Sequence, residues 1–326
     1  MATSVLEALE RHVGAGDLVV IGDGASTPVE VCGDLAAHAR QVGAFDLLLG
    51  WWLAPMHGID WSAFRRVRTV LAGYGLRTEV DAGHVDYLPV RMGATPALLA
   101  HERPAVAIAN VADSADGPRL RTESSLARLA VENGATLIGL RADGATSTEA
   151  EAALTAAEVS LVDVELTAPF AIDPPGTDDV SRAIGATVAD LLPSGVRLQI
   201  APGPLGAAVL DAFSGSIHID TGVINDAVMD AVEAGKIEGD PLAPYVVGSS
   251  ELYRWAADRR LTRSISVTHD PARLASGRPL VAVNTALQID LDGQVNVERI
   301  TTSALAGIGG QPDYAAAATW HRDGLS

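Results

Sequence analysis

Cysteine is nearly absent from this sequence of 326 residues, in which Cys32 is the only example. A single cysteine excludes an internal disulfide and a thiolate metal cluster, and the apolar neighbours of Cys32 are typical of a small buried residue. The eight histidines are scattered, and neither they nor the acids show metal-ligand spacing. We therefore expect a site without metal.

Long apolar runs are lacking as well. The longest stretches, such as residues 45–53, are much shorter than the roughly 18 residues that a membrane helix needs. The first residues carry Glu7 and Glu10 and show no apolar segment of a signal peptide. We expect a cytoplasmic protein that has no membrane partner.

Positive charge is scarce: 23 Lys and Arg stand against 41 Asp and Glu, and the formal net charge is -18. Binding to a nucleic-acid backbone needs clustered cations, so a nucleic-acid partner is disfavoured. An anionic cofactor stays compatible with this balance, because backbone N–H groups at glycine-rich turns and helix N-termini bind anions locally.

What the first half does contain is a repeated α/β pattern. A helix is predicted over residues 5–13, and short apolar runs then alternate with helical or turn-rich segments. The first run leads into the glycine-rich loop Gly22–Pro28. The predicted strands cover residues 17–22, 45–50, 67–71, 105–111, 136–140 and 159–166. This alternation indicates an open, mostly parallel sheet.

The strongest break in the pattern is Pro174-Pro175-Gly176, after which a helix (180–192) and a strand (196–200) are predicted. The strand runs into a second loop, residues 201–206. We expect two related α/β domains, 1–178 and 179–326, separated by a cleft that the Gly22–Pro28, Gly203 and Gly309 loops face. After a predicted helix at 313–320, an α/β sheet would normally continue with another buried strand.

Several ordered motifs resemble one known family. They are residues 284–296, 307–313, 248–253, 198–203 and 230–235 and, more weakly, 22–28, 87–90 and 105–111. In this order and spacing they closely resemble the family I CoA-transferases and acetyl-CoA hydrolases, which include 4-hydroxybutyrate CoA-transferase. The resemblance implies the CoA-transferase fold, coenzyme A bound as an acyl-CoA substrate, and activity as an acyl-CoA:carboxylate CoA-transferase or acyl-CoA hydrolase. Its partners would be an acyl-CoA and a carboxylate acceptor, and we expect a homo-oligomer.

The glycines of these motifs suit a thioester site. Gly307, Gly309, Gly310 and Gln311 directly precede a predicted helix, where backbone N–H groups without a nearby Cβ can approach an oxyanion or a pantetheine carbonyl. Gly203 is a further CoA-binding candidate, although the prolines on both sides of it remove N–H donors. The alternative is that these are turn and packing glycines.

The resemblance breaks at the nucleophile. In this family a glutamate attacks the acyl-CoA and becomes a glutamyl-CoA thioester, but the matching residues 216–226 contain no glutamate. Alignment on Ile217-His218 places Asp220 at that position, whereas alignment on Asn225-Asp226 places Gly222 there. Asp220 is therefore either a nucleophile or a turn residue. His218 is either a catalytic residue or a packed, hydrogen-bonded histidine.

Three functional hypotheses follow from this break. The first is a transferase or hydrolase that uses Asp220. The second is a diverged enzyme without covalent carboxylate chemistry, which cleaves a thioester or a C–C bond with water. The third is a non-catalytic subunit that binds CoA as a scaffold. In each of them Trp51, Trp52 and His57 either line an acyl pocket or belong to the core, and Glu298 is interpreted as surface charge.

Overall fold

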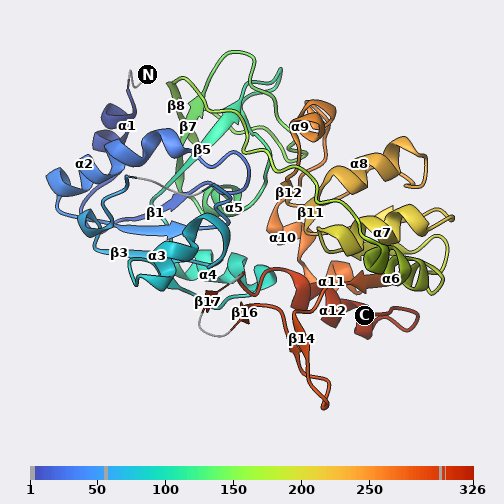
Figure 1. Ribbon diagram of the computed structural model, residues 1–326. Helices are drawn as coiled ribbons and strands as arrows, with labels where there is room; N and C mark the ends of the chain where they lie inside the picture. Colours follow the sequence, from blue (N-terminus) through green and yellow to red (C-terminus); the bar gives the residue numbers. More distant parts are fainter. Residues whose placement is uncertain (1–3, 55–57, 301–302, 305) are drawn as a thin grey trace.

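The computed structural model describes residues 4–54, 58–300, 303–304 and 306–326. Figure 1 shows two α/β halves side by side, with the N-terminal half coloured blue to green and the C-terminal half yellow to red. The predicted fold class, mostly parallel α/β sheets, is confirmed.

The first half is built on a parallel sheet with the strand order β4-β3-β2-β1-β5-β7-β8, and β6 adds to β5 in the antiparallel direction. Its strands are β1 (Leu18–Ile21), β2 (Asp46–Leu49), β3 (Arg66–Thr69), β4 (Asp86–Tyr87), β5 (Val106–Ala112), β6 (Arg119–Leu120), β7 (Thr136–Arg141) and β8 (Val159–Asp163). Every residue of β1 and β5 is buried, as expected for central parallel strands that are covered on both faces.

Helices cover both faces of this sheet and form two cores. The helices of this half are α1 (Val5–His12), α2 (Cys32–Val42), α3 (Arg77–Asp81), α4 (Thr95–Glu102) and α5 (Leu126–Glu132). Helices α1 and α2 pack on one face, and α4 and α5 pack on the other. Helix α1 begins where the Ser4 side chain accepts a hydrogen bond from the Glu7 N–H, a normal N-cap.

The second half contains a smaller sheet with the order β10-β9-β13, in which all pairs are parallel. The strands of the second half are β9 (Arg197–Ile200), β10 (His218–Ile219), β11 (Val223–Ile224), β12 (Tyr245–Val246), β13 (Leu280–Val283), β14 (Gln288–Ile289), β15 (Val295–Asn296), β16 (Arg299–Ile300) and β17 (Ser303–Ala304). Outside the three-stranded sheet they form the pairs β11-β12, β14-β15 and β16-β17. Its helices are α6 (Asp179–Ala189), α7 (Pro204–Ala212), α8 (Asp226–Glu233), α9 (Ser250–Ala256), α10 (Ile265–Thr268), α11 (Pro271–Leu274) and α12 (Gln311–Trp320).

Two features of the chain path bear on the sequence predictions. The predicted domain division, 178/179, falls in the segment between β8 and α6, where the Asp178 side chain accepts a hydrogen bond from Ser181 N–H and starts α6. After α12 the chain returns to the smaller sheet, where Leu325 pairs in parallel with Val281 next to β13. This is the place at which a further strand was expected.

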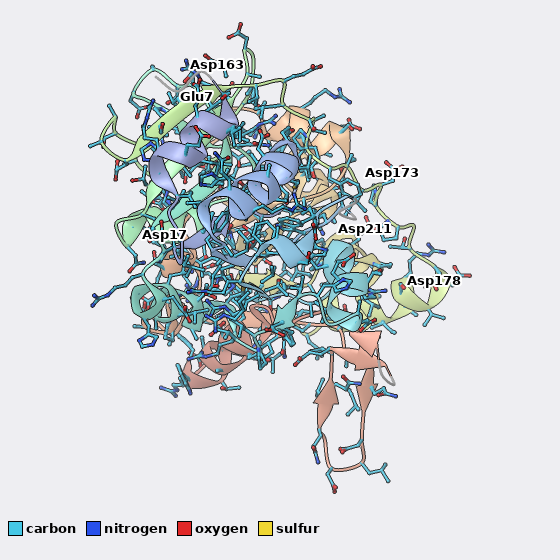
Figure 2. The ribbon with its side chains drawn as sticks, turned by 90° about the vertical axis from the view of Figure 1, so that its left-hand side faces the viewer. Glu7, Asp17, Asp163, Asp173, Asp178 and Asp211 are labelled. Atoms are coloured by element: carbon cyan, nitrogen blue, oxygen red, sulfur yellow. The ribbon has the colours of Figure 1, made fainter. Side chains whose placement is uncertain are left out.

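Acidic side chains project from several parts of the surface. Figure 2 shows Glu7 on α1, Asp163 on β8, Asp173 and Asp178 in the segment between β8 and α6, and Asp211 on α7, and all five are exposed. Among the described residues, no helix is both long enough and apolar enough to cross a membrane.

Candidate functional site

A cavity of about 260 Å³ lies between the two halves, at the carboxyl ends of several strands. Trp51 and Leu71 follow β2 and β3 in the first half, and Gly222 and Asn284 follow β10 and β13 in the second. Ligands of open parallel sheets bind at this edge, because the loops after the strands meet there. A second cavity of about 210 Å³ adjoins the first and shares Trp51, Tyr74, Pro202 and Val223 with it.

The loop before α12 borders the cavity with Gly307, Ile308, Gly309, Gly310 and Gln311. Ile308 N–H donates to the Tyr87 hydroxyl at 3.0 Å, and Met92 N–H donates to the Gly309 carbonyl at 2.9 Å. Both partners belong to the first half, so this half holds the loop in place. Gly309 has φ +64, a left-handed conformation that favours glycine.

Within the described residues, the N–H groups of Gly309, Gly310 and Gln311 have no protein acceptor. Gly310 is the N-cap of α12 and provides no side-chain cap. These N–H groups lie at the positive end of the helix dipole and next to the cavity. The loop therefore offers hydrogen-bond donors to a negatively charged or strongly polarised oxygen.

Asp313 anchors α12 to the first half. Its carboxylate accepts a hydrogen bond from the Gly93 N–H at 2.8 Å and pairs with Arg91. Burial raises the pKa of Asp313, and the hydrogen bonds from Gly93 and Arg91 act in the opposite direction. The glycine loop is thus fixed at both ends from the neighbouring half.

His269 lines the cavity beneath Gly310 and is 1% exposed. Its Nδ1 lies 3.0 Å from the Thr268 hydroxyl, whose single hydrogen is donated to the Ser264 carbonyl. This arrangement favours the tautomer in which Nδ1 carries the proton, which leaves Nε2 as an acceptor without a partner among the described residues. Burial lowers the pKa of His269 to about 3. A Cβ added at Gly310 would overlap this Nε2, so only glycine fits above the ring.

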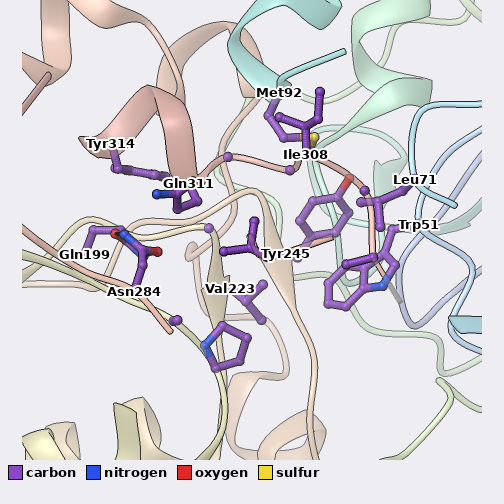
Figure 3. Close-up of a pocket in the computed structure, with 18 of the residues that line it drawn as sticks. Trp51, Leu71, Met92, Gln199, Val223, Tyr245, Asn284, Ile308, Gln311 and Tyr314 are labelled. Carbon is purple, nitrogen blue, oxygen red and sulfur yellow. Dashed lines mark hydrogen bonds between the residues drawn. The ribbon is translucent and has the colours of Figure 1, made fainter. Parts of the chain in front are cut away.

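Uncharged amides form one end of the cavity. Gln199 and Asn284 exchange two hydrogen bonds, at 3.1 and 2.9 Å, and Gln311 lies close to them (Figure 3). Trp51, Leu71 and Met92 lie at the opposite end. The two ends of the cavity thus differ in polarity.

The structure brings most of the predicted CoA-binding residues together. Gly307, Gly309, Gly310 and Gln311 line the first cavity. Gly203, with φ +119, lines the second cavity and precedes α7. The Gly22–Pro28 loop lies outside the described lining of both cavities. It contacts the lining residues from behind, because Asp23 accepts hydrogen bonds from Tyr245 and Trp51 and the Gly24 N–H donates to the Trp51 carbonyl.

Asp220, the candidate nucleophile, is not brought to the cavity. Its side chain is 4% exposed and accepts two hydrogen bonds from Arg273, at 2.7 and 3.0 Å, and a longer one from Arg197 at 3.3 Å. Gly222 does line the cavity, and a Cβ added there would meet no atom within 4 Å. The position at which a longer side chain would reach the cavity is therefore that of Gly222.

His218 also lies away from the cavity lining. His218 lies on the edge strand β10, and its Nε2 is 3.2 Å from a carboxylate oxygen of Glu238. Trp51 lines both cavities, whereas Trp52 is buried against Trp61 in the core. His57 lies outside the described residues, and Glu298 is partly buried next to the lining residue Val297.

Several lining residues were missed by sequence reasoning, among them His269, Tyr245 and Tyr314. Tyr314 lies directly after the motif 307–313. Its position at the start of the predicted helix, next to the glycine loop, could have indicated that it lines the site. His269 and Tyr245 stand in stretches without glycine or motif, and nothing in their spacing indicates a site.

The fold and the cavity define a class: an α/β protein of two halves that holds its ligand between them, at the edge formed by the strand carboxyl ends. Comparisons with known proteins agree with this class. Residues 248–326 match the acetyl-CoA hydrolase/transferase C-terminal domain. RipA from Yersinia pestis has a solved structure that superposes with a TM-score of 0.86 over 99% of this chain and 80% of that chain, at 21% identity.

Two curated relatives carry the likeness into the first half. The 4-hydroxybutyrate coenzyme A transferase of Clostridium kluyveri is 25% identical over 79% of this chain and 64% of its own length. The succinyl-CoA:acetate/propanoyl-CoA:succinate CoA transferase of Fasciola hepatica is 24% identical over 95% of this chain and 69% of its own length. The alignment thus spans less than two thirds of the Clostridium protein.

Residues 248–326 therefore match the acetyl-CoA hydrolase/transferase C-terminal domain, and the whole chain is similar to CoA-transferases in sequence and in fold. The predicted resemblance is confirmed.

Proposed function

We propose that this chain acts on a CoA thioester held in the cavity between its two halves, and that it transfers CoA to a carboxylate or hydrolyses the thioester. The observation that carries this proposal is the glycine loop before α12, in which the N–H groups of Gly309, Gly310 and Gln311 border the cavity and have no acceptor among the described residues. The relatives named as CoA transferases support the same chemistry. CoA is the substrate in this proposal, and we expect the protein to work as a homo-oligomer.

The loop suits the charge that develops in this reaction. Attack on a thioester carbon moves negative charge onto the carbonyl oxygen, and fixed N–H donors stabilise it most strongly where water is excluded. Gly309, Gly310 and Gln311 provide such donors at a helix N-terminus, and Tyr87 and Met92 hold them in place without reorganisation. No group of three or more His, Cys, Asp or Glu that could hold a metal ion occurs in the described part of the chain.

We further propose that Asp220 does not act as a nucleophile, because both of its oxygens are engaged by Arg273. The attacking group is then the acceptor itself. A carboxylate attacks the thioester carbon, the C–S bond breaks, and CoA thiolate departs. The two acyl groups are then joined in a mixed anhydride. The thiolate then attacks the second carbonyl of the anhydride, which gives the new thioester and releases the original acid. With water in place of the carboxylate, the products are the acid and CoA.

Two rival functions make different predictions. A covalent transferase would form a CoA thioester on Asp220, and a scaffold would bind CoA without turnover. Incubation of the full chain with acetyl-CoA and acetate or butyrate, followed by borohydride or hydroxylamine and peptide mass spectrometry, separates them. We expect turnover without an adduct on residues 216–226. An adduct on Asp220 would restore the covalent route, and binding without turnover would indicate the scaffold. The absence of both binding and turnover would refute the proposal.

A further inference from the structure

One end of the cavity is apolar and contributed largely by the first half. Figure 3 shows Trp51, Leu71, Met92 and Ile308 gathered around Tyr245 at this end, away from the amides of Gln199 and Asn284. Tyr74 packs edge-on against Trp51, with ring centroids 5.4 Å apart. No Lys, Arg, Asp or Glu occurs among the described residues that line the cavity. A charged group placed here would have no side chain of opposite charge to pair with.

Two buried acids lie behind this apolar wall. Asp23 is fully buried and accepts hydrogen bonds from the Trp51 N–H at 3.0 Å, from the Tyr245 hydroxyl at 2.8 Å and from Ser125. Glu123 is fully buried as well, and its Oε1 has no partner in the described structure. Three donors to one carboxylate fix Trp51 and Tyr245 relative to each other across the two halves.

The Asp23 hydrogen bonds determine the shape of the apolar end. Trp51 and Tyr245 stand perpendicular to each other, with ring centroids 5.4 Å apart. The backbone of Trp51 and the hydroxyl of Tyr245 both donate to Asp23 Oδ2, so neither the Trp51 backbone nor the Tyr245 ring can shift without losing a buried hydrogen bond. The apolar end is thus preformed around the Tyr245 ring and the Trp51 backbone.

Resting on the proposed function, we infer that this end selects an uncharged, apolar acyl group, and that Asp23 is the positioning residue that shapes it. A dicarboxylic acyl group would lose the hydration of its second carboxylate without gaining a cation. The structure therefore favours a butyryl-like group over a succinyl-like group.

The test is the ratio of kcat/KM for butyryl-CoA to that for succinyl-CoA, measured on the full chain with acetate as the acceptor. We expect butyryl-CoA to be preferred at least tenfold. Equal use of the two, or a preference for succinyl-CoA, overturns the inference and leaves the proposed function standing. If neither is turned over, the ratio of their dissociation constants from calorimetry replaces kcat/KM. If neither binds, the proposed function fails together with the inference.

A charge-adding variant tests the cause of the preference. Tyr74 lines the apolar end but is 48% exposed, so Tyr74→Arg adds a cation there without opening the core. We expect it to shift the butyryl to succinyl ratio at least tenfold toward succinyl-CoA. Trp320→Arg adds the same charge at an exposed position of α12 outside the described lining and should leave the ratio unchanged. Equal shifts in both variants would assign the effect to net charge and overturn the inference.

Asp23→Asn tests the positioning role. It keeps the size of the side chain but replaces one acceptor oxygen with an NH₂ donor, which cannot accept the hydrogen bonds from Trp51, Tyr245 and Ser125 in the same way, so we expect the butyryl to succinyl ratio to fall several-fold. Asp46→Asn is the matched control, because Asp46 is also buried in the first half, at the start of β2, and pairs with Arg65 and Arg66 outside the cavity lining. If Asp23→Asn does not fold, Tyr245→Phe releases the same ring. A folded variant of Asp23 or Tyr245 with an unchanged ratio contradicts the role.

Discussion

Asp220 stabilises the second half through its two arginines. Removal of one partner from a buried ion pair leaves the other charge uncompensated. Asp220→Ala should therefore destabilise the protein by about 3 kcal/mol, near the low end of the range for buried pairs because Arg273 keeps some exposure. Denaturant unfolding measures this change. Activity per folded molecule should change little, and a folded variant that loses several orders of magnitude in turnover would instead make Asp220 catalytic.

Gly222 occupies the position from which a side chain would enter the cavity. Since an added Cβ meets no atom within 4 Å, Gly222→Glu should fold and present a carboxylate to the thioester. We expect this variant to form a trappable CoA adduct and to gain ping-pong transfer kinetics. Gly222→Gln is the matched control without a nucleophile. If Glu and Gln variants behave alike, Gly222 does not correspond to the nucleophile position of the family.

Glu123 should make stability depend on pH. Burial raises its pKa from 4.5 to about 8 in the folded protein, so between these values the folded state binds more protons than the unfolded state. Stability must then fall as the pH rises through this window. His269, whose pKa is lowered to about 3, acts in the opposite direction below its unfolded value of 6.5. The contribution of Glu123 is therefore clearest between pH 6.5 and 8.

Glu123→Gln removes this proton without changing the shape of the side chain. The variant should gain stability relative to the original chain as the pH increases from 6.5 to 8, measured by denaturant midpoints at each pH. A difference between the two proteins that stays constant over this range would show that Glu123 does not titrate there.

At the scale of elements, the contact between α12 and α10 depends on glycine. Gly310→Ala would place its methyl group against His269, so the loop must move and its N–H groups lose their alignment with the cavity. We expect at least a tenfold loss in kcat/KM for acyl-CoA, with a smaller change in global stability. Adding His269→Ala should restore a large part of the activity. Failure of the double variant to recover would mean that the loop responds to some other contact.

The elements themselves were largely predictable from sequence, because parallel strands are buried on both faces and appear as short apolar runs. Residues 105–111 and 136–140 were predicted within a residue or so of β5 and β7. The role of the segment 216–226 could not be predicted from sequence. Sequence does not show that Arg197 on β9 and Arg273 on α11 converge on Asp220. Gly307–Gln311 was found because glycines before a helix carry a local signal, whereas Tyr245 enters the cavity through tertiary packing alone.

At the scale of the whole molecule, the net charge of -18 opposes an anionic substrate. CoA carries several phosphate charges, and exposed acids such as Asp173 and Asp211 surround the body of the protein (Figure 2). Salt screens this repulsion over about 10 Å at 0.1 M. KM for acyl-CoA should therefore fall several-fold as salt increases from about 10 to 150 mM. An acyl-pantetheine without phosphates should show no such change, and a KM that rises with salt would indicate a local cationic site for CoA.

The hydrogen bonds between the halves join residues far apart in the chain, with 222 positions between Asp23 and Tyr245 and 220 between Gly93 and Asp313. On the ribosome, the first sheet emerges complete once β8 has been made, but Asp23 has to wait for β12 and the glycine loop for α12. The apolar wall around Trp51 is therefore exposed during synthesis, at a stage when its sheet can already fold. The binding site can therefore form only after α12 has been made, and until then this open wall can bind chaperones that recognise apolar surface.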